Sequence, residues 1–316
     1  MNNTIASSAL LSLKYSKDFF GHPQGNTLSN INITIEDIID AIKTISQNSS
    51  GGPDEFPAIL LKQCSMSLAH PLQLLYKASL KTGEIPADLK RAIITPIYKG
   101  GSRKLPKNYR PVALTSHVIK IMEKILAKNI HQFLETHQKM NPKQHGFCSG
   151  GSCLSQLLEH DNKILEELEK SNNVDVINLD FAKVFDKLDR VILLNKLKKI
   201  LINGKIDVWI HNFLSNRQQR VAVNGTALGE AQVRSGISQG SVSGPLLFLK
   251  HISDINYEIA DSTVSCFADD TRILLGIKDE EDMQMLQNDL HKLNKWADTN
   301  NMKFNANFCD MEKNRK

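Results

Sequence analysis

The sequence predicts a mixed α/β (α+β) protein in which amphipathic helices alternate with short strands. Apolar residues recur at helical spacing over 35–45 and 118–134. Runs rich in β-branched residues at 92–98, 174–179 and 264–275 are typical of strands. With 316 residues, of which 41% are hydrophobic and 23% charged, the chain is long enough for two packed subdomains.

The first half of the chain begins with a segment, 1–30, that is rich in Asn and Ser, which predicts a loose N-terminal arm. Thr34 and Asp37 have the spacing of a capping box, so a helix is expected to follow. Two more helices are expected at 57–68 and 71–81, with the prolines near their starts.

The strand at 92–98 contains Pro96, which favours an edge position because proline cannot donate to a ladder. A basic glycine-rich loop, 99–104, follows it. Another helix is expected at 152–170, before an apolar strand over 174–179.

In the second half, helices are expected at 190–202 and 207–214. Asn224-Gly225 between two β-prone runs is typical of a hairpin turn. The small-residue loop 236–244 is expected to open a helix that reaches Ile259. One more helix, carrying Leu286 to Trp296, precedes a short strand at 302–304 and a polar tail.

Composition excludes several classes of protein. The net charge is +5, from 39 Lys and Arg against 34 Asp and Glu, which permits a polyanionic partner without requiring one. The five cysteines are scattered and form no CxxC pair, which favours small core residues in a reducing compartment over a disulfide framework or zinc site. No apolar run reaches the length of a membrane span, and no secretory signal is expected.

Asp269 and Asp270 stand between two apolar, β-prone runs, which predicts a β-hairpin with carboxylates at its tip. Adjacent carboxylates repel each other, whereas a hard cation such as Mg²⁺ prefers carboxylate oxygens. A solvated turn is the alternative, since Asp is common in turns.

A third acidic residue, Asp180, ends the buried strand 174–179 and therefore faces the rim of the sheet. Asp180 and Asp269 together could hold two Mg²⁺ ions for phosphoryl transfer. Asp186 and Asp189 are expected only to cap the next helix.

The loop 238–245 contains Gln239 and Gly240. Its glycines would let the backbone approach a flat ligand, and Gln239 could bind a base or sugar. The alternative is a plain helix-initiating loop with Pro245 in the first turn.

Five motifs occur in a fixed order along the chain, and together they resemble those of reverse transcriptases, in particular of jockey-like non-LTR retrotransposons. The resemblance covers roughly residues 51–308. The motifs are Asn108-Tyr109-Arg110-Pro111, Gln144-His145-Gly146-Phe147, Asp180 to Asp186, Gln239-Gly240-Ser241-Val242 and Phe267-Ala268-Asp269-Asp270.

The resemblance implies a right-hand polymerase with fingers and a ferredoxin-like palm. It assigns 31–172 to the fingers and connecting helices, 173–310 to the palm and 311–316 to a polar tail. No thumb is expected within the chain, which would then be a truncated copy.

The resemblance also implies roles for single residues. Asp180, Asp269 and Asp270 would be the catalytic carboxylates and metal ligands, with the carbonyl of Phe181 as a further ligand. Phe185 would be the steric gate against a ribose 2′-hydroxyl.

Three further residues would contact the substrates. Gln239 and Gly240 would lie under the incoming nucleotide and template. Arg110 would either face the triphosphate or bond backbone carbonyls, and both readings stay open.

Several positions depart from the family pattern. Cys148, Ser149 and Gly151 replace residues that are usually basic, and Lys250 and His251 interrupt an apolar helix. Phe308 stands where a Lys is typical, and it cannot protonate pyrophosphate.

The expected function is therefore that of an RNA-directed DNA polymerase. It would use two Mg²⁺ ions, an RNA template, a DNA primer and dNTPs, with no membrane and no small-molecule cofactor beyond the metal. The localisation is open beyond an intracellular one, with the nucleus implied only by the resemblance, and the oligomeric state is open as well.

Two alternatives remain. One is a degenerate retroelement relic that binds nucleic acid weakly without catalysis. The other is an unrelated Mg²⁺-dependent phosphotransferase, which would not explain Gln239 or Phe185.

Overall fold

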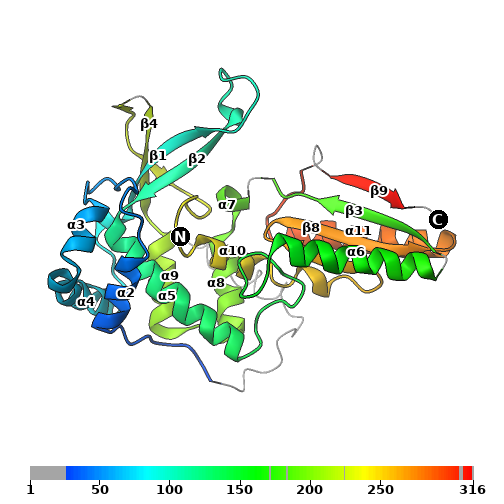
Figure 1. Cartoon of the computed structure of the whole chain (residues 1–316), viewed down its shortest axis with the longest axis horizontal. Helices are drawn as coiled ribbons and strands as arrows, with labels where there is room; N and C mark the ends of the chain where they lie inside the picture. The colour runs from blue at the N-terminus through cyan, green and yellow to red at the C-terminus, as the bar shows by residue number, and fades with distance from the viewer. Residues whose placement is uncertain (1–25, 171, 183, 224, 306–308, 315–316) are drawn as a thin grey trace, which may run out of the picture.

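The chain forms two β-sheets joined by a body of helices, and Figure 1 shows the first sheet above that body and the second sheet to its right. The computed structural model describes residues 26–170, 172–182, 184–223, 225–305 and 309–314. The expected arm at 1–30 thus lies almost wholly outside the described residues.

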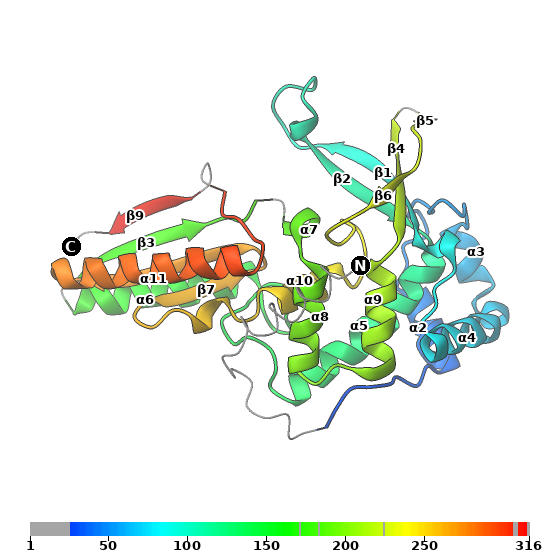
Figure 2. The same cartoon turned by 180° about the vertical axis from the view of Figure 1, so that it is seen from behind.

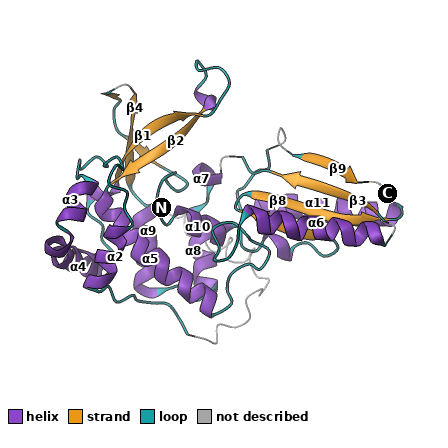
Figure 3. Cartoon of the chain, in the orientation of Figure 1, coloured by secondary structure: helices purple, strands orange, loops and turns teal. Residues whose placement is uncertain are grey.

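The helical body carries most of the main hydrophobic core. Its helices, purple at the left and centre of Figure 3, are α2 (Ile35–Lys43), α3 (Ala58–Gln63), α4 (Ser65–Thr82), α5 (His117–Thr136), α8 (Arg190–Lys199) and α9 (Gly204–Leu214).

Sequence signals gave the start of α2 correctly, because Thr34 and Asp37 form the expected capping box. The expected helix boundary before Pro71 was wrong, since α4 runs continuously through this proline. Proline removes only one backbone bond, and Ala69 and Leu72 on either side remain buried. None of the described helices is long and apolar enough to cross a membrane.

The first sheet has the order β2-β1-β4-β5, with β6 also paired to β4. Its strands are β1 (Arg91–Tyr98), β2 (Tyr109–Thr115), β4 (Arg217–Val223), β5 (Thr226–Ala227) and β6 (Ala231–Val233). The β4–β5 pairing confirms the hairpin expected around Gly225.

The edge position expected for the strand with Pro96 was wrong, because β1 is central. However, β4 pairs only with Arg91 to Ile94, so Pro96 has a strand on one side alone. In the β1–β2 ladder Pro96 faces Pro111, and two prolines can oppose each other only as a non-hydrogen-bonded pair, so the missing N–H points away from β2 and breaks no ladder bond. Strand β4 pairs with β1 although it lies within 173–310, the range assigned to the palm.

The second sheet is fully antiparallel with the order β7-β8-β3-β9. Its strands are β3 (Asn173–Leu179), β7 (Thr263–Phe267), β8 (Asp270–Ile277) and β9 (Asp310–Asn314). Helix α10 (Gly244–His251) precedes β7, and α11 (Glu280–Thr299) follows β8. This β-α-β-β-α-β connection is ferredoxin-like, as expected.

Three local expectations for this region were wrong. Residues 311–314 of the expected polar tail instead belong to β9, which pairs with β3. The strand expected at 302–304 is reduced to one bridge between Phe181 and Phe304. Helix α10 ends at His251 and does not continue to Ile259.

Helices α6 (Cys153–Glu169) and α11 cover opposite faces of the second sheet (Figures 1 and 2). Leu274 on β8 packs in a cluster with Ile164 and Leu168 of α6. Its neighbour Ile273 belongs to the main core, together with α11. Because alternate strand residues face opposite sides, the sheet lies between the two helices.

Candidate active site

The acidic hairpin forms as predicted, at the end of the second sheet next to the helical body (Figure 1). The last pair of β7 and β8 joins Phe267 to Asp270, so Ala268 and Asp269 make a two-residue turn. Ala268 has φ +54°, the left-handed conformation that tight hairpin turns demand. The turn brings the two carboxylates to the tip of the hairpin.

Asp180 arrives at the same edge by strand register. Leu179 on β3 is paired with Thr271 on β8, so the next residue, Asp180, lies across from Asp270. Antiparallel partners have Cα atoms about 5 Å apart. Residues far apart in the chain thus place three carboxylates at the same end of the second sheet.

The electrostatics of the site show that these carboxylates interact. Burial raises the pKa of Asp269, and the charges of Asp270 and Asp180 raise it further. Burial and the charge of Asp180 likewise raise the pKa of Asp270, while Arg272 opposes the rise. A cation would relieve this repulsion, so the donor set fits a hard metal ion. Among the described residues, however, no three His, Cys, Asp or Glu side chains converge into a complete ion site.

Asn305 holds Asp180, and this contact was missed in the sequence. Its backbone N–H donates to the Asp180 carbonyl (2.7 Å), and its Nδ2 donates to Asp180 Oδ2 (3.2 Å). Asn305 lies in the same segment as Phe308, where the sequence departs from the family pattern, but only the fold brings it to the end of β3. Phe308 itself lies outside the described residues.

The carbonyl of Phe181 has a backbone geometry compatible with the expected role. The Ala182 N–H donates to the Lys303 carbonyl, and the Asn305 N–H donates to the Asp180 carbonyl. These two hydrogen bonds lie on either side of the Phe181–Phe304 bridge. In such a pair the polar groups of the central residue point away from the partner segment. The Phe181 carbonyl therefore faces the side of β3 that carries β8.

Phe185 lies in α7 (Val184–Lys187) and is half-buried, with its ring 5.4 Å from that of Phe248. Its carbonyl accepts the Ile237 N–H (2.7 Å) at the start of the small-residue loop. A Cβ on Gly236 would lie 2.2 Å from the same carbonyl, so that loop packs directly on α7.

Gln239 and Gly240 connect α7 to the first sheet. The Ala113 N–H on β2 donates to the Gln239 carbonyl (2.6 Å), and Gln239 Nε2 lies 3.5 Å from Asp186 Oδ1. Gly240 has φ +114°, and a Cβ there would lie 2.6 Å from the Ala113 carbonyl. Asp189 caps α8 as predicted, whereas Asp186 lies inside α7 and contacts Gln239 instead.

Arg110 is exposed on β2, opposite Ile97 on β1. It belongs to a hairpin tip, 99–110, that holds five basic and no acidic residues. Two tyrosines brace this tip, with the Tyr98 and Tyr109 rings 5.5 Å apart and the Arg103 guanidinium 4.9 Å above the Tyr98 ring. Arg110 thus lies on β2 in the first sheet, whereas the three carboxylates lie at the end of the second sheet. Figure 1 shows β1 and β2 projecting from the helical body.

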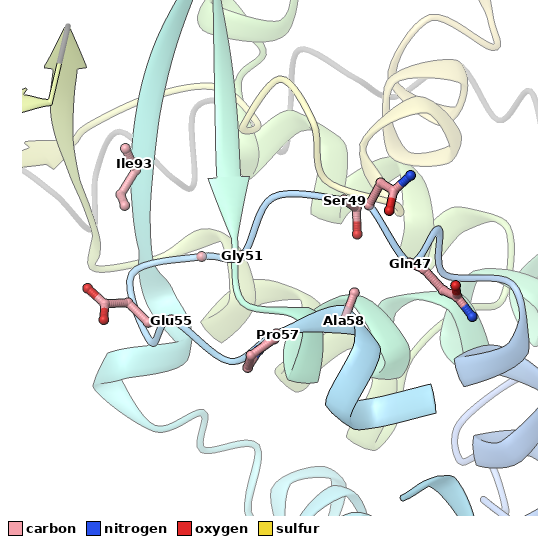
Figure 4. A pocket seen from close by; sticks show the side chains of 9 residues that line it. Gln47, Ser49, Gly51, Glu55, Pro57, Ala58 and Ile93 are labelled. Atoms are coloured by element: carbon pink, nitrogen blue, oxygen red, sulfur yellow. The ribbon is translucent and has the colours of Figure 1, made fainter. Parts of the chain in front are cut away.

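A cavity of about 470 Å³ lies between the α2–α3 connection and β1, lined by residues between 47 and 58 and by Ile93 (Figure 4). None of the predicted site residues lines it.

Comparison with known proteins decides the family. The family model described as "Reverse transcriptase (RNA-dependent DNA polymerase)" matches residues 97–315, more than half of the chain. The chain belongs to the reverse transcriptase family. Its resemblance to the jockey-like group is confirmed by its similarity to the polymerase of the mobile element jockey.

Two curated relatives from Drosophila melanogaster illustrate the similarity. The chain is 28% identical over 250 residues to "Probable RNA-directed DNA polymerase from transposon BS", covering 77% of this chain and 28% of that protein. It is 26% identical over 288 residues to "RNA-directed DNA polymerase from mobile element jockey", covering 88% of this chain and 31% of that protein. This reverse transcriptase chain thus spans about a third of the relatives it matches.

A solved structure supports the polymerase fold. The structure of apo telomerase from Candida tropicalis, truncated from its C-terminal domain, matches with a TM-score of 0.53 and 11% identity. The match covers 79% of this chain and 56% of that chain. At this identity the similarity concerns the fold alone.

The departures from the reverse transcriptase pattern have structural counterparts. A Cβ on Gly151 would lie 2.2 Å from the His145 carbonyl, so the loop as folded cannot hold a basic side chain there. Cys148 is half-buried and Ser149 exposed. Lys250 and His251 are both buried, and each has a hydrogen-bond partner that the sequence could not reveal.

Proposed function

We propose that this chain is the fingers and palm of an RNA-directed DNA polymerase from a jockey-like retroelement. The observation that carries the proposal is the register that sets Asp180 against Asp270 beside the Asp269 turn. The second sheet with its helices would be the palm, and the first sheet with the helical body the fingers.

In the proposed reaction, the primer 3′-oxygen attacks the α-phosphorus of a dNTP. A new P–O bond forms, the bond to pyrophosphate breaks, and the 3′-hydroxyl releases its proton to solvent water. Asp180, Asp269 and Asp270 would hold two Mg²⁺ ions, with the Phe181 carbonyl as a further ligand. Bound ions supply charge stabilisation to the attacking and leaving oxygens.

The remaining predicted residues would position the substrates. The half-buried Phe185 ring would exclude a 2′-hydroxyl, and Gln239-Gly240 would lie beneath the nucleotide and template. Arg110 and the cationic hairpin 99–110 would contact phosphates, since clustered Lys and Arg with aromatic rings suit nucleic acid.

The test is primer extension by the purified chain on a primed RNA template with Mg²⁺ and dNTPs. Asp269→Asn should abolish extension, because it removes a ligand charge. Asp298→Asn, an exposed carboxylate on α11, is the matched control and should retain activity. Extension that survives Asp269→Asn would show that the chemistry occurs elsewhere.

A relic that binds nucleic acid without catalysis is the second candidate. The loop at Gly151 favours it, because the family usually has a basic side chain at this position and the folded loop leaves no room for one. Salt-dependent binding of a primed RNA template without any Mg²⁺-dependent extension would select this candidate.

A further inference from the structure

The segment 143–146 lies along the outer edge of β7 and ends at the acidic turn. The Cys266 N–H donates to the Lys143 carbonyl, and the His145 N–H donates to the Cys266 carbonyl, both at 2.9 Å. Gln144 and Cys266 form a parallel bridge. The segment therefore acts as a short additional strand beside the hairpin.

The Gln144 side chain pairs with the backbone of the turn. Its Oε1 accepts the Ala268 N–H (2.8 Å), and its Nε2 donates to the Ala268 carbonyl (3.2 Å). Oε1 also accepts the Gly146 N–H (2.8 Å). The residue is only 9% exposed, so water competes little for these bonds. Both polar backbone groups of the residue before Asp269 are thus fixed by one side chain.

The turn needs such support. Ala268 has an unfavourable left-handed φ, and the carboxylates that follow it repel each other and Asp180. A Cβ on Gly146 would lie 2.4 Å from the Ala268 nitrogen, so the segment packs tightly on the turn. His145 anchors the segment to α6 through Glu159 and Ser155, each at 2.9 Å.

We propose that Gln144 is a positioning residue that fixes the Ala268–Asp269 turn so that Asp269 and Asp270 face Asp180 as metal ligands. The inference rests on the proposed function, because it assumes that the carboxylates bind a metal ion. Gln144 itself would touch neither metal nor substrate.

The test measures Mn²⁺ binding by electron paramagnetic resonance and amide hydrogen exchange at Ala268 in the full chain. Gln144→Met keeps the length of the side chain but loses all three bonds. It should weaken Mn²⁺ binding by about tenfold or more, as loss of an outer-shell partner typically does, and should speed Ala268 exchange. Gln73→Met is the matched control, since Gln73 Nε2 bonds the Ile33 carbonyl (2.9 Å) within the helical body.

Wild-type Mn²⁺ affinity and Ala268 protection in folded Gln144→Met would overturn the inference. If that variant does not fold, Gln144→Asn keeps the amide but is one methylene too short, and the same two readouts apply. Asp269→Asn separates the two hypotheses. Unchanged Mn²⁺ binding in Asp269→Asn would count against the proposed function, whereas weakened binding there but not in Gln144→Met would remove only the role of Gln144.

Discussion

Lys250 lies in the last turn of α10 with its ammonium group enclosed by protein. The residue is 2% exposed, and its Nζ donates to the Lys139 carbonyl (3.1 Å) and contacts Met140 Sδ (3.3 Å). Burial lowers the pKa of Lys250 to about 8, and the nearby Cys148 thiol only partly opposes this. We therefore expect Lys250→Met to stabilise the protein at pH 7.

The magnitude follows from the pKa difference between the folded and unfolded chain. A lysine with an ordinary pKa of 10.5 that falls to about 8 on folding destabilises its charged form by about 3 kcal/mol. Methionine removes this cost but loses a hydrogen bond worth about 1 kcal/mol. The net gain in the free energy of unfolding at pH 7 should be about 2 kcal/mol.

The sign of the pH dependence is also fixed. Between pH 8 and 10.5 the unfolded chain holds a proton that folded Lys250 has released, so wild-type stability rises with pH in this window. The variant lacks this contribution, and its advantage should disappear as the pH approaches 10.5.

Urea unfolding of both proteins from pH 7 to pH 10 measures the difference. Lys295→Met, an exposed change on α11, is the control and should have little effect at any pH. A variant that is less stable than wild type at pH 7, or a difference that does not change with pH, would refute the reasoning.

Three further predictions concern acid stability, sugar selection and product length. Burial lowers the pKa of His251 to about 3. The free energy of unfolding should therefore fall by up to about 1.4 kcal/mol for each pH unit below pH 6.5, and it should fall less in His251→Asn. Equal acid sensitivity of the two proteins in urea titrations would contradict this. Phe185→Val should raise ribonucleotide relative to deoxyribonucleotide incorporation in single-addition assays, and an unchanged ratio would leave Phe185 a core aromatic. The chain should add only a few nucleotides per binding event near physiological salt, because Cys148 and Ser149 supply no charge to the nucleic acid; long products under single-turnover trapping would show the opposite.

Local signals in the sequence were sufficient for most elements of this protein. The capping box at Thr34, the strand that ends at Leu179 and the hairpin around Asp269 depend on residues close in the chain, and each formed as expected. The ordered motifs likewise identified the reverse transcriptase family before any fold was known.

The long-range pairing of strands was not predicted from the sequence. Strand β9 has the polar sequence Asp-Met-Glu-Lys-Asn, which reads as a tail, yet the free edge of β3 provides its backbone partners. Pro96 suggested an edge strand, but the short parallel contact with β4 stops before it. Such pairings depend on backbone groups that every residue except proline carries, so the side-chain pattern of a strand does not identify its partner.

The support of the candidate site was decided by tertiary structure alone. The sequence marks Asp269 and Asp270 because two adjacent carboxylates stand between apolar runs, and Asp180 because it ends a buried strand. It does not mark Gln144 or Asn305 as their supports, because a buried amide has the same local pattern as an exposed one. Only the folded chain brings these amides within hydrogen-bond distance of backbone and carboxylate groups more than a hundred residues away.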